Sequence, residues 1–345
     1  FRRARVLERV FFGNILFLFV LLISIGIILL FIIENILVVA LMLVGGQLLL
    51  VIFSSKLIGT MAEWTVSEQN PNVHILQYHL PAKERAQFQQ KHPRETLLQM
   101  KKEIYEKTVA VGKAVDCETA REVMAKHGLE CLPENMKTKT VDVYALVKKA
   151  AERFNLPLPK IIVSNTMMPN AAASGPSPRY GVVLVTTGLL VQLEEDEILT
   201  VLGHELSHLH GRDNFFLLGL FSSEYLFHVF FLWPYIMDFF LLYFFLSTGG
   251  MYFVAKFFEA RADLESAIKI GNPKVLAEAL RKIGFRRLQF ERVPAARIQD
   301  WITWDPHPPI YFRVARLEKM EATVEVKHTL FQSARDCIQG FFKAF

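Results

Sequence analysis

Long apolar runs constrain this chain most strongly, because each has the length that crosses a lipid bilayer as a single helix. Residues 10–33 form 24 positions without a charged side chain, and residues 36–55 form 20 more after Glu34 and Asn35. A helix rises about 1.5 Å per residue, so either run can span roughly 30 Å of hydrocarbon. We therefore predict an N-terminal transmembrane hairpin over residues 1–56.

A second apolar region occupies residues 214–255, where Glu224 and Asp238 are the only formal charges. It is long enough for two passes, and residues 233–235 (Trp-Pro-Tyr) near its middle supply a turn. The alternative is a buried helical hairpin in a soluble core. A hydrophobic content of 52% and a mean hydropathy of +0.27 favour the membrane.

The charges at the ends of the apolar runs predict the topology. One end of each predicted pass is flanked by a cation, and the opposite ends carry acids but no lysine or arginine: Arg9, Lys56, Arg212 and Lys256 against Glu34 and Asp238. By the positive-inside rule, both hairpins enter from the cytoplasm and return to it. Residues 57–213 and 256–345 are then cytoplasmic regions, in an integral plasma-membrane protein with four transmembrane helices.

The two soluble regions have the pattern of a mainly α, α+β fold. Helical periodicity covers most of residues 81–113, 118–127, 141–154 and 194–212, and residues 256–345 are mainly helical. Short β-prone runs at residues 160–164, 169–174 and 180–186 predict a small sheet.

Cysteine content and charge indicate the compartment and the partners. Cys117, Cys131 and Cys337 are odd in number and lack CxxC spacing, so we expect reduced thiols. A net charge of +5 suits anionic lipid headgroups. Basic residues gather between positions 281 and 297, and no pattern of a nucleic-acid-binding module accompanies them, so we expect lipid and no nucleic acid as their partner.

The chemistry concentrates in residues 203–211, GHELSHLHG. His204 and His208 are four residues apart, so on a helix they project from one face and can bind one zinc ion. Glu205 adjoins the first ligand and can act as general base for a water that zinc activates. His210 lies on another face and is interpreted as a surface histidine. The alternative is an amphipathic helix that matches HExxH by chance.

A catalytic zinc typically has three protein ligands, and Glu259 in FFEARAD is the candidate for the third. Asp263 lies four residues later on the same helix face. The predicted hairpin enters the membrane just after His208 and leaves it just before Glu259, which returns the carboxylate to the level of the histidines. A solvated helix face beside Arg261 is the competing interpretation.

HELSH followed after a membrane hairpin by EARAD resembles the HtpX-type membrane metallopeptidases, gluzincins related to the CAAX prenyl endopeptidases. The resemblance covers most of residues 160–320 and both hairpins. It implies zinc at His204, His208 and Glu259, with Glu205 as base, and it implies a cytoplasmic gluzincin-like domain. Asp263 is then a carboxylate that orients a ligand.

Two further segments are similar to this family. NAAASG resembles the edge strand that holds an extended substrate, which implies substrate binding at Asn170, Ala171 and Ala172. HPPIYFRVARL is similar to the family's His-Pro segment, which implies that His307 lies near the developing oxyanion and Arg313 near Asp263. The alternatives are a turn cap at Asn170, a structural His307 before proline, and a surface role for Arg313 and Arg316.

We therefore predict a membrane-embedded zinc endopeptidase that acts on polypeptides at the cytoplasmic face, with misfolded or membrane proteins as substrates. The alternatives are a CAAX-type processing peptidase, or a non-catalytic zinc-binding scaffold in which Glu205 would have no purpose. Glu224 and His228 form another i,i+4 pair, inside a predicted pass. We interpret it as structural or cavity-lining, because no third ligand accompanies it.

Overall fold

A computed structural model describes residues 35–60, 62–79, 94–111, 115–232, 239–321 and 326–345, with isolated positions at 25–26, 28–29, 32–33, 88, 90–91 and 113. The predicted span at residues 10–33 and the turn at residues 233–235 lie almost entirely outside these residues. The contacts divide the chain into two compact units. One unit joins residues 1–71 to residues 143–345, and the other is residues 72–142.

The larger unit contains a four-stranded mixed sheet in the order β1-β4-β6-β5. The strands are β1 (Trp64–Val66), β4 (Lys160–Ser164), β5 (Ala171–Ser174) and β6 (Val182–Thr186). β4 and β6 are parallel, and β1 and β5 pair antiparallel to their neighbours. All five residues of β6 are buried, which fits its apolar sequence VVLVT. The three predicted strands are confirmed, and β5 forms one edge of the sheet.

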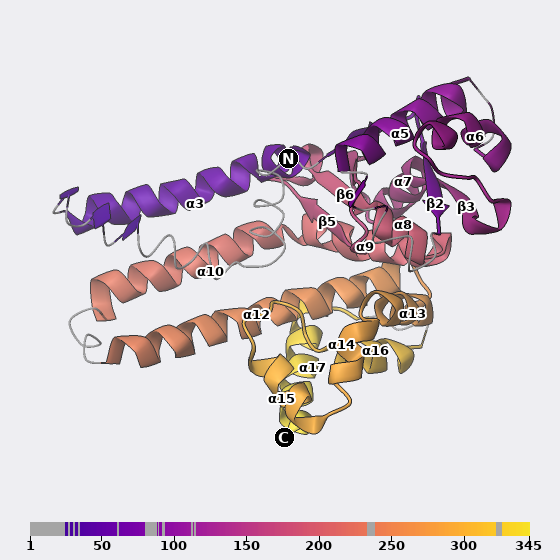
Figure 1. Cartoon of the computed structure of the whole chain (residues 1–345). Helices are drawn as coiled ribbons and strands as arrows, with labels where there is room; N and C mark the ends of the chain where they lie inside the picture. Colours follow the sequence, from indigo (N-terminus) through magenta and orange to yellow (C-terminus); the bar gives the residue numbers. More distant parts are fainter. Residues whose placement is uncertain are drawn as a thin grey trace. The chain divides into compact units, whose positions relative to one another are not determined.

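Helix α9 (Glu195–Gly211) carries the HExxH sequence and lies between strand β5 and helix α12 (Phe240–Lys269) (Figure 1). It begins with a capping box in which the Glu194 amide donates to Glu197, and three acids occupy its first turn. It ends where Arg212 adopts a left-handed conformation, with φ of 54°. α9 packs against α7 (Val143–Arg153), α12 (Phe240–Lys269) and α13 (Pro273–Ile283). The predicted helix over residues 194–212 is therefore confirmed.

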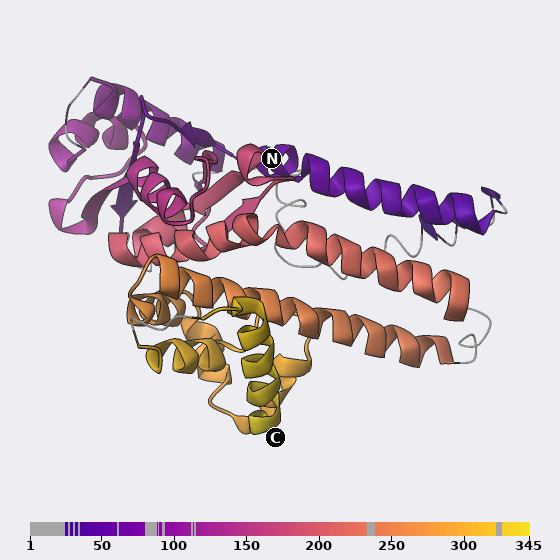
Figure 2. The ribbon, with the colours of Figure 1, turned by 180° about the vertical axis from the view of Figure 1, so that it is seen from behind.

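Three apolar helices extend from this body: α3 (Ile36–Gly59), α10 (Asp213–Phe227) and α12 (Figures 1 and 2). Two described helices, Ile36–Gly59 and Leu241–Lys269, are long and apolar enough to cross a membrane. α10 is shorter and continues as a π-helical turn, η4 (His228–Leu232). Ser222 donates to Gln47 at 2.7 Å, which links α10 to α3.

The polar pair inside the second apolar region lies between two of these helices. Oε1 of Glu224 accepts hydrogen bonds from Tyr243 at 2.7 Å and from Ser247 at 2.6 Å, both on α12. The ring of His228 lies 5.0 Å from that of Tyr243. These contacts connect α10 to α12, which agrees with a structural role for the pair.

The C-terminal helices pack around α12. They include α14 (Phe285–Phe290), α15 (Pro294–Ile302), α16 (Ile310–Glu318) and α17 (Thr329–Ala344). Their core contains Trp301, Cys337 and Ala260, with Phe253 and Phe341 packed against them. This core surrounds the half of α12 that carries Glu259, so it fixes the position of that residue.

The smaller unit pairs β2 (Asn72–Tyr78) antiparallel with β3 (Met136–Asp142) and adds α5 (Arg94–Lys107) and α6 (Cys117–Lys126). Cys117 and Cys131 form a disulfide, whereas Cys337 is free and buried. The expectation of reduced thiols was therefore wrong for the first two cysteines, and the cysteines do not support a reducing compartment for this unit. Their spacing gives no sequence signal, because the end of α6 turns back at Gly128, with φ of 71°, and brings the two Cα atoms to 5.4 Å.

Candidate metal centre

One face of α9 presents the histidine pair. Nε2 of His204 and Nε2 of His208 lie 3.3 Å apart, with the rings nearly perpendicular at 84°. His204 is buried, and His208 is partly exposed. The four-residue spacing on a continuous helix produces this convergence.

Glu259 reaches the same point from α12. Its Oε2 lies 3.3 Å from Nε2 of His204, and its Oε1 lies 3.4 Å from Nε2 of His208. Among the described residues, His204, His208 and Glu259 form a group whose ligand atoms are close enough together to hold one metal ion. His208 and Glu259, which are 51 positions apart in sequence, therefore lie together. The sequence predicted this proximity from a hairpin that returns to the side where it begins.

These three residues fit a zinc ion. Tetrahedral zinc with bonds of about 2.0–2.1 Å to nitrogen and oxygen separates its ligand atoms by roughly 3.3–3.4 Å. The observed separations are 3.3, 3.3 and 3.4 Å. Oε2 of Glu259 is also buried without a hydrogen-bond partner among the described residues. A buried carboxylate oxygen without a donor suits a cation.

Behind His204, a buried ion pair supports the ring. Nδ1 of His204 lies 2.9 Å from Oδ1 of Asp263. Arg313 on α16 then holds both carboxylate oxygens of Asp263, at 2.6 and 2.7 Å. This bidentate pair is fixed in direction, so Asp263 orients the ring with Nε2 toward Glu259.

A matching arrangement supports His208, and it was not predicted from the sequence. Nδ1 of His208 lies 2.7 Å from Oδ2 of Asp213, whose carboxylate accepts from Nη2 of Arg261 at 2.7 and 2.8 Å. Asp213 is 2% exposed. Two sequence features could have indicated this arrangement. Asp213 is an acid five residues after His208, and Arg261 lies between Glu259 and Asp263.

The charges around His204 favour a cation at this position. Burial by itself lowers the pKa of His204, but the carboxylates of Asp263 and Glu259 outweigh burial and raise it to about 10. The surroundings therefore stabilise one positive charge beside Glu259. A metal ion bound to Nε2 would supply that charge in place of a proton.

Glu205 is hydrogen-bonded to the sheet and is not one of the three candidate ligands. Its Oε2 accepts a hydrogen bond of 3.1 Å from the amide of Ala173 on β5. Burial raises the pKa of Glu205, while His204 and His208 act in the opposite direction. A carboxylate with a raised pKa, next to the ligands but not among them, is placed to accept a proton.

His307 joins the cluster from the loop before α16. Its Nε2 lies 3.6 Å from Oε2 of Glu259, and its side chain is 48% exposed. Nδ1 lies 2.8 Å from Oδ1 of Asp305, which also accepts from the His307 amide. Asp305 therefore directs Nε2 of His307 toward the cluster.

β5 brings the remaining predicted residues to the site. The amide of Asn170 donates to Oγ1 of Thr186, and its carbonyl accepts from the Thr186 amide at 3.1 Å. Main-chain direction alternates along a strand, so Ala171 and Ala173 direct their amides and carbonyls toward the open edge. The amides and carbonyls of Asn170 and Ala172 point in the opposite direction, toward β6. Ala173, which the sequence analysis did not name, is the edge residue that contacts Glu205.

Other residues weighed in the sequence lie apart from the metal ligands. His210 is exposed and approaches Lys269 at 3.3 Å. Arg316 pairs with Asp336 at 2.8 Å instead of Asp263. Glu224 lies between α10 and α12, as described above.

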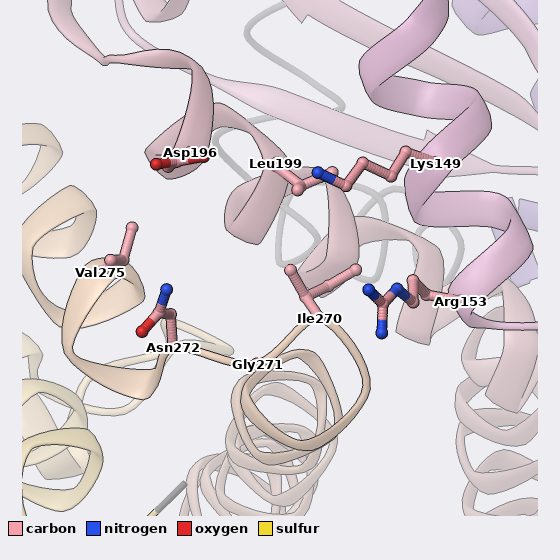
Figure 3. Close-up of a pocket in the computed structure, with 8 residues that line it drawn as sticks. All are labelled: Lys149, Arg153, Asp196, Leu199, Ile270, Gly271, Asn272 and Val275. Atoms are coloured by element: carbon pink, nitrogen blue, oxygen red, sulfur yellow. The ribbon is translucent and has the colours of Figure 1, made fainter.

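A surface hollow of about 130 Å³ also lies away from the ligands (Figure 3). It opens between α7, α9 and the corner from α12 to α13. Its lining is Lys149, Arg153, Asp196, Leu199, Ile270, Gly271, Asn272 and Val275. Leu199, the lining residue of α9 that is nearer to the histidines in sequence, precedes His204 by five residues, or about 7.5 Å along α9. None of the three candidate ligands lines the hollow.

Comparison with known proteins agrees with this geometry. Residues 137–321, just over half of the chain, match Peptidase family M48. The chain belongs to this family. It is 31% identical over 221 residues to a protease HtpX homolog of Moorella thermoacetica, covering 53% of this chain and 73% of that protein.

Two further relatives extend the comparison. A protease HtpX homolog of Desulfatibacillum aliphaticivorans is 29% identical over 214 residues, which is 52% of this chain and 68% of the relative. Another, of Thermodesulfovibrio yellowstonii, is 38% identical over 91 residues, which is 26% of this chain and 31% of the relative. The chain thus aligns with between about a third and three quarters of these relatives. The family that matches is a family of peptidases.

Proposed function

We propose that this chain is a zinc-dependent endopeptidase whose active site lies at the cytoplasmic surface of a membrane. The observation that supports this proposal most directly is the convergence of His204, His208 and Glu259, with the carboxylate of Glu205 next to these residues but not among them. A structural zinc would use four protein ligands and would need no base. Three ligands and a base suit hydrolysis.

His204, His208 and Glu259 would hold the zinc, which would polarise the substrate carbonyl and increase the acidity of water. Glu205 accepts a proton from the attacking water and can deliver it to the leaving amine. His307 donates from Nε2 toward the carbonyl oxygen as negative charge develops there. Asp263 and Asp213 keep the two histidine rings in their binding orientation.

An extended polypeptide is the substrate that the edge strand favours. Ala171 offers its amide and carbonyl along the open edge of β5, and Ala173, whose amide donates to Glu205, offers its carbonyl. Added strands bind by such main-chain groups. The proposed substrate-binding segment therefore consists of the three residues predicted from the sequence and of Ala173: Asn170, Ala171, Ala172 and Ala173. Main-chain pairing accepts many sequences, so unfolded or misfolded chains, including those of membrane proteins, are the proposed class.

For the topology, we propose four passes: a hairpin in residues 1–56 and a second one in residues 214–255. Residues 57–213 and 256–345 are then the two cytoplasmic regions. Lys56 at the end of α3 and Arg212 before α10 support a cytoplasmic side. We propose a role in quality control of membrane proteins, which this placement would support.

The test is Glu205→Gln in the full chain. Glutamine can still accept from Ala173 but cannot take a proton, so we expect zinc content to persist while hydrolysis of unfolded casein falls by about 10²–10⁴-fold. Glu195→Gln, at the exposed start of the same helix, is the matched control and retains activity. Unchanged hydrolysis in Glu205→Gln would exclude this mechanism.

A further inference from the structure

Lys256 is a buried cation to which the proposed mechanism gives no role. It lies on α12, three residues before Glu259, and its side chain is 0% exposed. Within the described residues, main-chain carbonyls hold its Nζ in place of a carboxylate. Burial of a cation removes its hydration and opposes folding unless strong contacts replace the water. The presence of Lys256 is therefore explained by what its contacts hold in position.

Lys256 connects a loop to α12. Its Nζ donates to the carbonyl of Thr303 at 3.2 Å and to the carbonyl of Asp305. Both carbonyls belong to residues 303–309, an irregular segment between the end of α15 and the start of α16. An ammonium group has three donors, so one side chain can hold two carbonyls of this segment at once. His307 lies in the same segment, and its main chain is thereby fixed relative to α12.

The carboxylate of Asp305 is held by a second cation. Its Oδ2 accepts a hydrogen bond from Nη1 of Arg287 at 2.6 Å. Its Oδ1 accepts from the His307 amide at 2.9 Å and lies 2.8 Å from Nδ1 of the His307 ring. Burial raises the pKa of Asp305, but His307 and Arg287 outweigh burial and lower it, so this carboxylate is ionised at neutral pH. Lys256 thus holds the main chain of Asp305, and Arg287 holds its side chain.

The His307 ring depends on these contacts because packing encloses it only partly. Its side chain is 48% exposed, whereas those of His204 and His208 are 9% and 17% exposed. Nε2 of His307 nevertheless lies 3.6 Å from Oε2 of Glu259. A ring that packing does not enclose keeps one orientation when hydrogen bonds fix it. Asp305 provides that hydrogen bond, and the two cations hold Asp305.

We propose that Lys256 and Arg287 are positioning residues that hold His307 beside Glu259. Lys256 fixes the main chain of Asp305 against α12, and Arg287 fixes the carboxylate that directs Nε2 of His307. The inference rests on the proposed function, in which His307 stabilises the developing oxyanion. That contact forms in the transition state, so displacement of His307 lowers kcat and leaves KM and zinc affinity unchanged.

The first test is Lys256→Met in the full, zinc-loaded chain, because methionine fills similar space without the ammonium group. We expect kcat for a fluorogenic peptide to fall by about 10–100-fold, since a misplaced group loses most of its contact with the transition state. KM and zinc affinity should stay at the parental values. Lys256→Gln retains an N–H donor and should recover part of the lost kcat. Lys269→Met, at the end of the same helix, is the matched control with parental kcat.

A double-mutant cycle shows whether Lys256 acts through His307. His307→Ala removes the ring, so adding Lys256→Met to it should cause no further loss of kcat. Arg287→Gln should give the same result, and it changes a side chain that is 29% exposed, which the fold tolerates better than a change at a buried position. Losses that multiply in either cycle overturn the proposal. A raised KM or weakened zinc binding in folded Lys256→Met also overturns it. A parental kcat in His307→Ala overturns the oxyanion role of His307 together with this proposal and leaves the assignment of Glu205 intact.

A second readout needs no turnover. It is the NMR signal of the His307 ring in the zinc-free chain with nitrogen-labelled histidine, assigned by its disappearance in His307→Ala. We expect the signal to shift in Lys256→Met and in Arg287→Gln, because each changes the contact between Nδ1 and Asp305, and to stay in place in Lys269→Met. An unshifted signal in the first two variants overturns the proposal even if the chain hydrolyses peptides. Failure of this proposal is thereby distinguished from failure of the proposed function.

Discussion

Nδ1 of His208 lies 2.7 Å from the carboxylate of Asp213, and Arg261 holds that carboxylate from the other side at 2.7 Å. His204 is supported in the same manner by Asp263 and Arg313. Each ligand histidine therefore has an arginine-backed carboxylate on Nδ1, which leaves Nε2 free for the metal. Arg261 of the first pair and Asp263 of the second both lie on α12, so one turn of this helix supports both rings.

Replacement of Asp213 by asparagine should weaken zinc binding by about 10–100-fold, because the neutral amide polarises and orients His208 less strongly. Competition with a chromogenic chelator measures this affinity. Asp336→Asn, which removes the partner of Arg316, is the matched control with unchanged affinity. If Asp213→Asn binds zinc as tightly as the parent while remaining folded, Asp213 has no positioning role.

The sequence predicted the ligands and missed Asp213 for a definite reason. On a continuous helix, a residue five positions after His208 lies about 140° around the axis and faces away. Arg212 is left-handed, with φ of 54°, and this break returns Asp213 to the ring. Helical spacing was enough to predict His204 and His208 as ligands. Glu259 could be predicted because both ends of a transmembrane hairpin return to the same side of the membrane. The disulfide and the β2–β3 pair depend on tertiary contacts that no local pattern reveals.

Gly203→Ala should destabilise the chain by about 1–3 kcal/mol, because overpacking forces neighbouring elements apart. A Cβ at this position would overlap Ile270 and lie 2.8 Å from Oγ of Ser266 on α12. Separating α9 from α12 also separates His204 from Glu259, so zinc affinity should fall with stability. Thermal unfolding with and without zinc measures both effects. Gly219→Ala on α10, where a Cβ meets nothing within 4 Å, should change neither.

Ala171→Pro should lower kcat/KM for an extended peptide by about tenfold, because proline removes a main-chain donor from the open edge of β5. Prolines are tolerated on edge strands, so the sheet should persist. Ala171→Gly retains the amide and is the control with near-parental kcat/KM. Zinc content should be equal in both variants. Equal kcat/KM in the two variants would show that substrate does not pair with this amide.

Replacing Cys117 and Cys131 together by serine should destabilise the unit of residues 72–142 by about 3 kcal/mol. The disulfide closes a loop with a sequence separation of 14 residues, and a loop of that length restricts the unfolded chain by about this amount. Hydrogen exchange at α6 measures the loss, which should appear as faster exchange in residues 117–126. The larger unit, including α9 and α12, should exchange as in the parent. Thiol titration of the denatured parent should find one reactive cysteine, Cys337, and a count of three would show that the bridge does not form.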